Sequence, residues 1–235
     1  MSIFHPALVA CRACGTKTEI ARSASVNADR RPDLRAAILD GSFQAADCPK
    51  CGTMLRLAPH LTYMDLANGL WIVAAEASGL EGWPDVEDEA RGTYAQSFGA
   101  GAPAIGQELG EGLKARLVFG WPALREKLHC SALGLDDVTL ELVKMAIMRN
   151  VDDAPIADET ELRLVGGAEE VLEFAWVVTE TEEELSGLEV PRDIYDGIAG
   201  DPAWVAMRDR FDDALLVDLR RFIAGPELAA AEAAE

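Results

Sequence analysis

The segment VACRACGTK at residues 9–17 decides the amino-terminal fold, because a near copy, ADCPKCGTM, returns at residues 46–54. Both contain the pattern Cys-x-x-Cys-Gly-Thr. A Cys-x-x-Cys-Gly turn directs both sulfurs at one centre, the glycine accepts the tight turn, and nearby amide N–H groups can donate to the sulfurs. The two segments together predict one tetrahedral site, with Cys11, Cys14, Cys48 and Cys51 as its ligands.

Zinc is the expected occupant of this site, one ion per chain, although the ligands alone leave iron open. Four thiolates close the coordination sphere, whereas catalytic zinc usually has three protein ligands and an open position. We therefore expect structural zinc. A thioredoxin-like redox pair is less favoured, because neither pair lies in a recognisable βαβ unit. His60, nine residues after Cys51, is a weaker candidate ligand.

The fifth cysteine, Cys130, lies next to His129. Adjacent residues do not face each other on a helix, so a buried structural thiol is favoured over a nucleophile with its base. The chain contains no His-x-x-Glu-His, Gly-x-Ser-x-Gly or P-loop motif. No catalytic residue and no site for an organic cofactor is predicted. The acidic run TETEEELSG at 179–187 is typical of a solvated turn, because it lacks the spaced ligands of a calcium loop.

The gap between the cysteine pairs is thirty-three residues, longer than in compact zinc sites. Its pattern predicts a strand at 16–26 and a helix at 31–41, with Pro32 at its start and Gly41 at its end. After the second pair, strand-like runs at 53–64 and 69–77 surround Asn68-Gly69, a hairpin signal. This is the plan of a zinc ribbon enlarged by a helical insertion.

The rest of the chain mixes helical and strand patterns, which predicts an α+β fold. We expect a zinc-ribbon-like domain at 1–79, an acidic Gly-rich connector at 80–111, an α+β domain at 112–225 and an acidic Ala-rich tail at 226–235. Within these, the patterns predict helices at 86–95, 121–130, 135–150 and 201–223, a strand at 115–120, a hairpin at 159–180 around Gly166-Gly167, and a strand leading into a helix at Pro191.

Charge divides the chain unevenly. Residues 1–60 hold eight Lys/Arg against five Asp/Glu, whereas the remainder holds thirteen against thirty-six. Such an acidic surface disfavours polyanions and anionic lipid. No run is apolar and long enough to span a membrane, and the amino terminus lacks the features of a secretory signal. Cysteines spaced as metal ligands are typical of the cytoplasm, which is the predicted location.

The arrangement CRACG, strand, RPDLRAAILDGSF, CPKCG and LTYMDLANGLWIV resembles the bacterial CpXC proteins, which are named for their Cys-Pro-x-Cys pairs. The resemblance continues at 116–147 and at 188–198, so it extends over nearly the whole chain. The family's cysteines correspond to Cys11, Cys14, Cys48 and Cys51; Arg12 stands where the first pair often has proline, which removes no ligand. The resemblance implies a zinc site and this architecture, and it supplies no reaction.

The leading hypothesis is therefore a non-enzymatic cytoplasmic zinc protein that acts as a protein-interaction or adaptor module, with protein partners. Two alternatives remain open. One is an enzyme whose active site lies between the domains and has no recognisable motif. The other is a nucleic-acid-binding zinc ribbon with six phosphate-contacting residues, Arg12, Arg22, Arg30, Arg31, Arg35 and Lys50.

Overall fold

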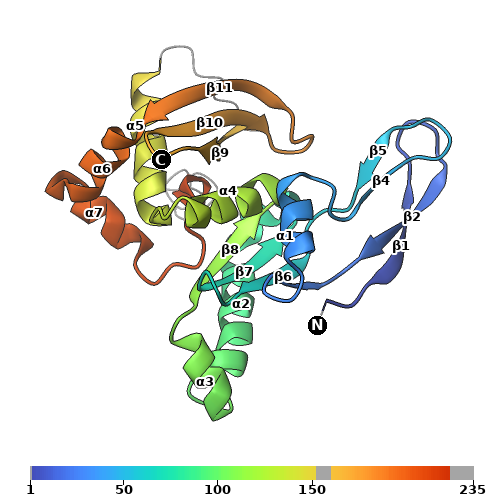
Figure 1. Ribbon diagram of the computed structural model, residues 1–235, viewed down its shortest axis with the longest axis horizontal. Coiled ribbons are helices and arrows are strands. Elements are labelled where there is room, and N and C mark those ends of the chain that lie inside the picture. Colours follow the sequence, from blue (N-terminus) through green and yellow to red (C-terminus); the bar gives the residue numbers. More distant parts are fainter. Residues whose placement is uncertain (1, 152–159, 223–235) are drawn as a thin grey trace, which may run out of the picture.

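The computed structural model describes residues 2–151 and 160–222 and has a mixed α+β fold, as predicted (Figure 1). The predicted tail at 226–235 lies outside the described residues. Two larger sheets with their helices form what we call the body. A smaller β structure containing residues 5–22 and 45–56, which we call the ribbon arm, lies at one side of it (Figure 1).

The ribbon arm consists of two short antiparallel pairs. Strand β1 (His5–Ala10) pairs with β2 (Lys17–Arg22), and β4 (Ala45–Asp47) pairs with β5 (Met54–Arg56). Ile20 and Leu55 are buried together with Cys11 and Cys48 in a small core of their own. So few apolar side chains contribute little burial energy, and the arm depends on another source of stability.

The first sheet of the body has the strand order β3-β6-β7-β8, with β3 (Ser25–Asn27), β6 (Leu61–Asp65), β7 (Leu70–Ala75) and β8 (Lys114–Phe119). The predicted hairpin is β6–β7, and Gly69 has a φ of 64° in its turn. Helices α1 (Pro32–Leu39) and α4 (Trp121–Ala132) pack on one face, and α2 (Trp83–Phe98) packs on the other.

The segment predicted as a connector, 80–111, contains the end of a 3-10 turn (Ala77–Gly82) and the whole of α2 and α3 (Ala104–Gly110). Helix α2 includes the predicted 86–95 helix and extends beyond it at both ends. Because β8 pairs in parallel with β7, the first sheet joins strands from both sides of the expected connector. The division into domains stays a prediction.

The second sheet has the order β11-β10-β9, all antiparallel, with β9 (Thr160–Gly167), β10 (Val171–Val178) and β11 (Glu184–Pro191). It packs against α5 (Asp137–Asn150) and α6 (Arg192–Gly200). Asp136 is the N-cap of α5, as expected, and accepts from the Thr139 N–H. Helix α4 lies between the two sheets and contributes to both cores (Figure 1).

The helix predicted at 201–223 is wrong within the described part, residues 201–222. Asp201 does cap a turn, but the chain forms only short pieces: Pro202–Trp204, α7 (Val205–Arg208), Asp209–Phe211 and Leu219–Phe222. Asp213 has a φ of 59°, which breaks a helix. Residues 214–218 then run as an irregular buried strap. Apolar residues that are buried on all sides need not recur at the spacing of a helix, so such a run does not identify a helix.

Buried charged side chains satisfy the backbone of this strap and of Leu219, which follows it. Glu87 accepts from the N–H groups of Leu215 and Leu216, and Glu141 accepts from that of Leu219 at 3.0 Å. Lys127 donates to the Val217 carbonyl at 2.7 Å. Buried backbone groups outside helices and sheets need such partners, which accounts for charged residues in the interior.

The acidic run at 179–187 was predicted as a solvated turn, but one of its residues, Glu182, is partly buried and forms ion pairs. Glu182 receives hydrogen bonds from Arg56 of the ribbon arm and Arg125 of α4, both at 2.7 Å. The Arg56 guanidinium also stacks on Trp121, 4.6 Å from the ring centroid. Arg12 pairs with Glu180 at 2.9 Å, and both of these side chains are exposed. Glu182 therefore clamps the arm to the body.

Candidate metal centre

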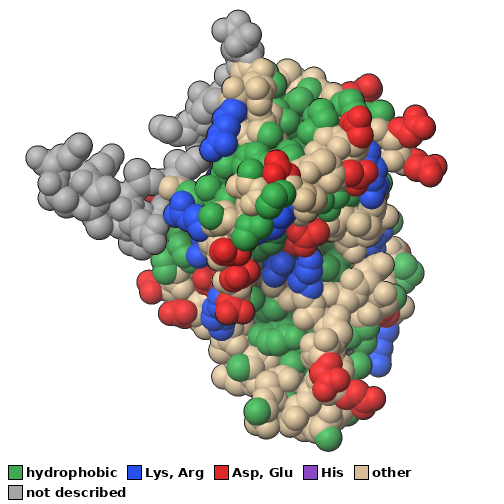
Figure 2. Space-filling view, turned by 90° about the vertical axis from the view of Figure 1, so that its left-hand side faces the viewer, with side chains coloured by type: hydrophobic (Ala, Val, Ile, Leu, Met, Phe, Trp, Pro, Cys, Tyr) green, Lys and Arg blue, Asp and Glu red, His purple; other side chains and the backbone are tan. Residues whose placement is uncertain are grey.

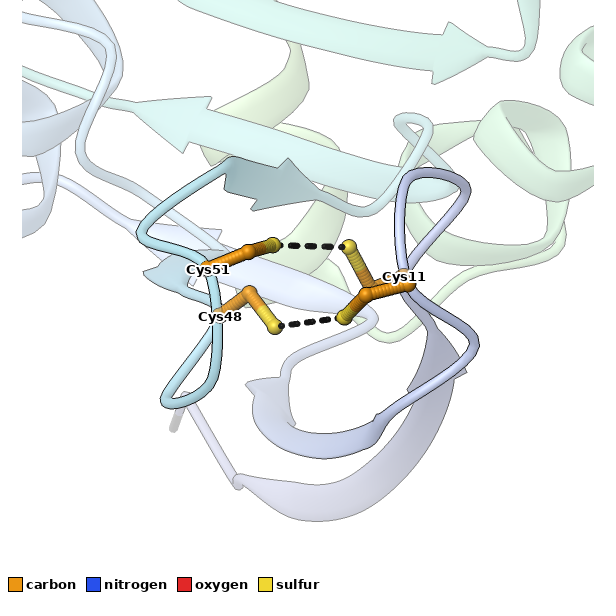
Figure 3. A group of neighbouring side chains, drawn as sticks. Cys11, Cys48 and Cys51 are labelled. Atoms are coloured by element: carbon orange, nitrogen blue, oxygen red, sulfur yellow. Dashed lines mark hydrogen bonds between the residues drawn. The ribbon is translucent and has the colours of Figure 1, made fainter.

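The four cysteine sulfurs converge at the end of the ribbon arm, as predicted. Cys11 Sγ lies 3.6 Å from Cys51 Sγ, and Cys14 Sγ lies 3.6 Å from Cys48 Sγ (Figure 3). All four sulfurs lie within 4.8 Å of one another. Each of the two contacts therefore joins one hairpin to the other, and neither hairpin forms the site alone.

The two hairpins have matching backbone geometry. The N–H of Cys11 donates to the Thr16 carbonyl at 2.9 Å, and that of Cys48 donates to the Thr53 carbonyl at 2.8 Å. The N–H groups of Gly15 and Gly52 donate to the carbonyls of Cys11 and Cys48, at 2.8 and 2.9 Å. Both glycines have a φ of 72°, a left-handed conformation that glycine adopts without strain. The repeated sequence thus produces a repeated structure.

Two threonines belong to the site and were not given a role by the sequence argument. Thr16 Oγ1 lies 3.3 Å from Cys14 Sγ, and Thr53 Oγ1 lies 3.3 Å from Cys51 Sγ. A hydroxyl that donates to a thiolate orients it and stabilises its charge. The signal was present in the sequence, because Cys-Gly-Thr occurs in both segments.

The environment differs between the cysteines. The hydroxyl and the N–H of Thr53 lower the pKa of Cys51 to about 6, and those of Thr16 lower the pKa of Cys14. Burial raises the pKa of Cys11 to about 11. A bound cation would favour the thiolate form of every ligand, including the buried one. In each pair the more exposed cysteine is thus the one whose pKa the neighbouring threonine lowers.

These distances fit a metal ion. Zinc–sulfur bonds of about 2.3 Å in a tetrahedron place the sulfurs about 3.8 Å apart. The two close sulfur pairs come near this value, and they are too far apart for a disulfide bond of about 2.05 Å. All five cysteines are free thiols. Among residues 2–151 and 160–222, these four cysteines form the one group of three or more ligand side chains close enough to hold a metal.

The other candidate residues lie away from this centre. His60 is exposed and does not belong to the cluster. Cys130 is buried in α4, where its Sγ donates to the Leu135 carbonyl at 3.3 Å and burial raises its pKa to about 12. This agrees with a structural thiol. Within the described chain, no helix is both long enough and apolar enough to cross a membrane.

The fold and the site together define the class: an α+β protein with a zinc-ribbon-like module that carries four converging cysteines. The family model described as CpXC protein matches residues 9–144, more than half of the chain, and includes all four cysteines. The chain belongs to the CpXC family. No curated protein and no solved structure matches it. The matched region ends at Lys144, so the resemblance at 188–198 lies outside it.

Proposed function

We propose that this protein holds one structural zinc ion and that its ribbon arm serves as a non-enzymatic protein-interaction module in the cytoplasm. The observation that carries the zinc proposal is the convergence of four thiols from two matched hairpins, with sulfur spacings close to a zinc tetrahedron. Four thiolates occupy every position of that tetrahedron and leave none for water. Zinc rather than iron is the usual occupant of such a mononuclear site, and reduced cysteines of this kind are typical of the cytoplasm.

Metal analysis of protein purified without chelators tests the zinc proposal. We expect about one zinc per chain, and almost none in the Cys48→Ser variant. Cys130→Ser is the matched control, because it makes the same substitution at a buried thiol outside the cluster and should retain the metal. A zinc content near zero in the unmodified protein, or one iron per chain, would overturn the assignment.

The interaction proposal rests on exposed apolar side chains beside the metal centre. Leu8 of β1 is 71% exposed and Met54 of β5 is 66% exposed, one on each hairpin. Water-exposed side chains of this size add nothing to the arm's own core, whereas burial against a partner would stabilise a complex. A metal that fixes both hairpins also fixes the spacing of these two side chains.

A three-way capture experiment tests this role. The unmodified protein, Cys48→Ser and the Leu8→Ser/Met54→Ser double variant are used to recover proteins from native lysate, and the recovered protein is then purified and its binding measured. Leu109→Ser, at an exposed apolar position of α3, is the control. We expect binding to be lost in both arm variants and kept in the control. Equal recovery by the unmodified protein and Cys48→Ser counts against the role.

Nucleic-acid binding by residues 1–79 receives less support. Of its six proposed contacts, Arg12 pairs with Glu180, Arg31 pairs with Asp33, and Arg35 lies 3.8 Å from Asp65. A cation that is already paired with a carboxylate gains less binding free energy from a phosphate contact. Figure 2 shows the face of the body that lies opposite the ribbon arm, and there too Lys and Arg side chains lie among Asp and Glu side chains. We therefore retain the protein-interaction role.

A further inference from the structure

A pocket of about 310 Å³ opens in the body, away from the metal centre. The turn between β6 and β7, the start of β8, the second half of α4 and the start of α5 form its walls. At one wall a Cβ on Gly69 would lie 2.7 Å from the Gly112 carbonyl oxygen, so only glycine allows this close approach. The pocket is at the lower end of the size range of small-molecule sites.

The charge of the lining is opposite to that of the protein. Three cationic side chains, Lys114, Arg116 and Lys127, and a single carboxylate, Asp137, line the pocket. The whole chain has a net charge of -20. The lining cations thus outnumber the lining carboxylate, although the Asp136 carboxylate lies 3.3 Å from Lys114 at the mouth, and such a recess in an acidic protein attracts an anion.

Two of the cations are held in place by the fold. The Arg116 guanidinium binds both Asp137 oxygens, at 2.6 and 2.9 Å, and Lys127 Nζ lies 3.0 Å from the same carboxylate. Lys127 also donates to the Val217 carbonyl of the strap. Their side chains are only 14% and 4% exposed. A structural role therefore accounts for Arg116 and Lys127.

Lys114 does not fit this structural explanation. Its ammonium lies at the mouth, 44% exposed, and its contacts with Asp136 and Asp137 are both long, at 3.3 Å. Asp136 is already engaged as the N-cap of α5, through the N–H and hydroxyl of Thr139. Lys114 thus keeps a loosely held ammonium beside two fixed cations, and the Ser131 side chain lines the same pocket.

We propose that this pocket binds a small phosphate monoester, with the phosphate between Lys114 and Lys127 and the organic part toward the opening. A phosphate monoester carries a charge of about -1.5 to -2 at neutral pH and offers three strong acceptor oxygens, whereas a carboxylate offers two. Its oxygens would accept from Lys114 and from the Ser131 hydroxyl, in addition to Lys127. The pocket and the ribbon arm are separate, so this proposal is independent of the interaction role.

The test is a titration of the full-length, metal-loaded protein with inorganic phosphate and with glycerol 3-phosphate, at constant ionic strength, followed by calorimetry. We expect saturable binding of both. Lys114→Met should weaken the binding roughly tenfold or more, because one charge-assisted hydrogen bond is lost. Ser131→Ala should weaken it by a smaller factor.

Lys17→Met is the matched control, since it removes the same charge from an exposed position of the ribbon arm. Its affinity should equal that of the unmodified protein. Circular dichroism should show that all three variants fold. Absence of saturable binding in the unmodified protein, or equal weakening by Lys114→Met and Lys17→Met, overturns the proposal, because the second result would mean only general charge attraction.

Discussion

Glu141 is a carboxylic acid with no exposed surface, held in α5. Burial raises the pKa of Glu141 to about 7, and the nearby carboxylates of Glu126 and Asp218 raise it too. Lys144 opposes this shift, because its Nζ lies 2.7 Å from Glu141 Oε1. An unfolded glutamate titrates near about 4.3. Between these two pH values the folded chain keeps a proton that the unfolded chain has released. Stability from this residue is therefore lost as the pH rises through this window.

We expect the free energy of unfolding of the unmodified protein to fall relative to that of Glu141→Gln as the pH rises from 5.5 to 8.5. The total change is about 2 kcal/mol, because the glutamate titrates over roughly 1.5 pH units of this range and the glutamine does not titrate. Denaturant unfolding at several pH values measures it, and Glu108→Gln, at an exposed position of α3, is the control. Parallel pH profiles for the unmodified protein and Glu141→Gln would show that Glu141 does not titrate in this range.

Single residues also show what the sequence could predict. The convergence of the four cysteines followed from their spacing and the adjacent glycines, because these signals are local. The buried charges did not. Glu126, Glu141 and Lys144 occupy helices whose pattern allows them a solvated face, but all three are buried. Glu126 binds Arg163, 37 residues later in the chain, and Glu141 accepts from the Leu219 N–H, 78 residues later. A contact between such distant segments leaves no mark in a local pattern.

At the scale of elements, Arg163 of β9 connects three parts of the body. Its guanidinium binds Glu126 of α4 at 2.8 Å, Glu161 of its own strand at 2.6 Å and Asp218 of the strap at 2.8 Å. All four side chains are buried. Removing one partner from a buried ion cluster leaves uncompensated charge, which costs more than the intact cluster contributes.

We expect Arg163→Met to lower the free energy of unfolding by about 3–5 kcal/mol, because three carboxylates then lose their shared cation. Chemical denaturation measures the loss. Arg22→Met removes the same charge from an exposed position of β2 and should change stability by no more than about 0.5 kcal/mol. A loss from Arg163→Met as small as that of the control would show that the cluster relaxes without cost.

A second prediction at this scale concerns Glu182, which links the ribbon arm to the body. In Glu182→Gln, Arg56 and Arg125 lose their shared counter-charge, so the arm should separate from the body more often, at a cost of about 1–3 kcal/mol. Amide hydrogen exchange at residues 54–57 should become faster while the metal content stays the same. Glu183→Gln, at the exposed neighbouring position, should have no effect. Unchanged exchange in both variants would contradict the clamp.

Hairpins and helix starts were predictable, because turn glycines, prolines and caps are local signals; Asn68-Gly69, Pro32 and Asp136 all lie where these signals placed them. The pairing of β8 with β7 was not, since it joins strands separated by two helices. The predicted helix at 201–223 failed because the apolar residues of the strap are buried from several directions and their backbone is satisfied by side chains.

For the whole molecule, the separation of cores predicts two responses to metal removal. The core of the ribbon arm shares no buried residue with the cores of the body, and α1 and β3, although they lie between the cysteine pairs, belong to the body. A chelator should therefore unfold residues 5–22 and 45–56 and leave the body folded. Hydrogen exchange read by mass spectrometry resolves the two regions.

Cys130→Ser should respond to the chelator as the unmodified protein does, because Cys130 lies in a body core. Loss of protection across β9 and β10 at the same chelator concentration would mean that the metal holds the entire fold. Metal-dependent folding is therefore expected of the ribbon arm rather than of residues 1–79 as a whole.

The clamp joins Arg56 to Glu182, which are 126 residues apart. A ribosome that adds about 5–20 residues per second needs roughly 6–25 s to cover that distance. All four cysteines are translated before Arg56. During this interval the nascent arm has only its metal and its small core to hold it together, because the residue that fixes it to the body has not yet been made. We therefore expect folding of the arm to depend on metal supply during synthesis as well as in the finished protein.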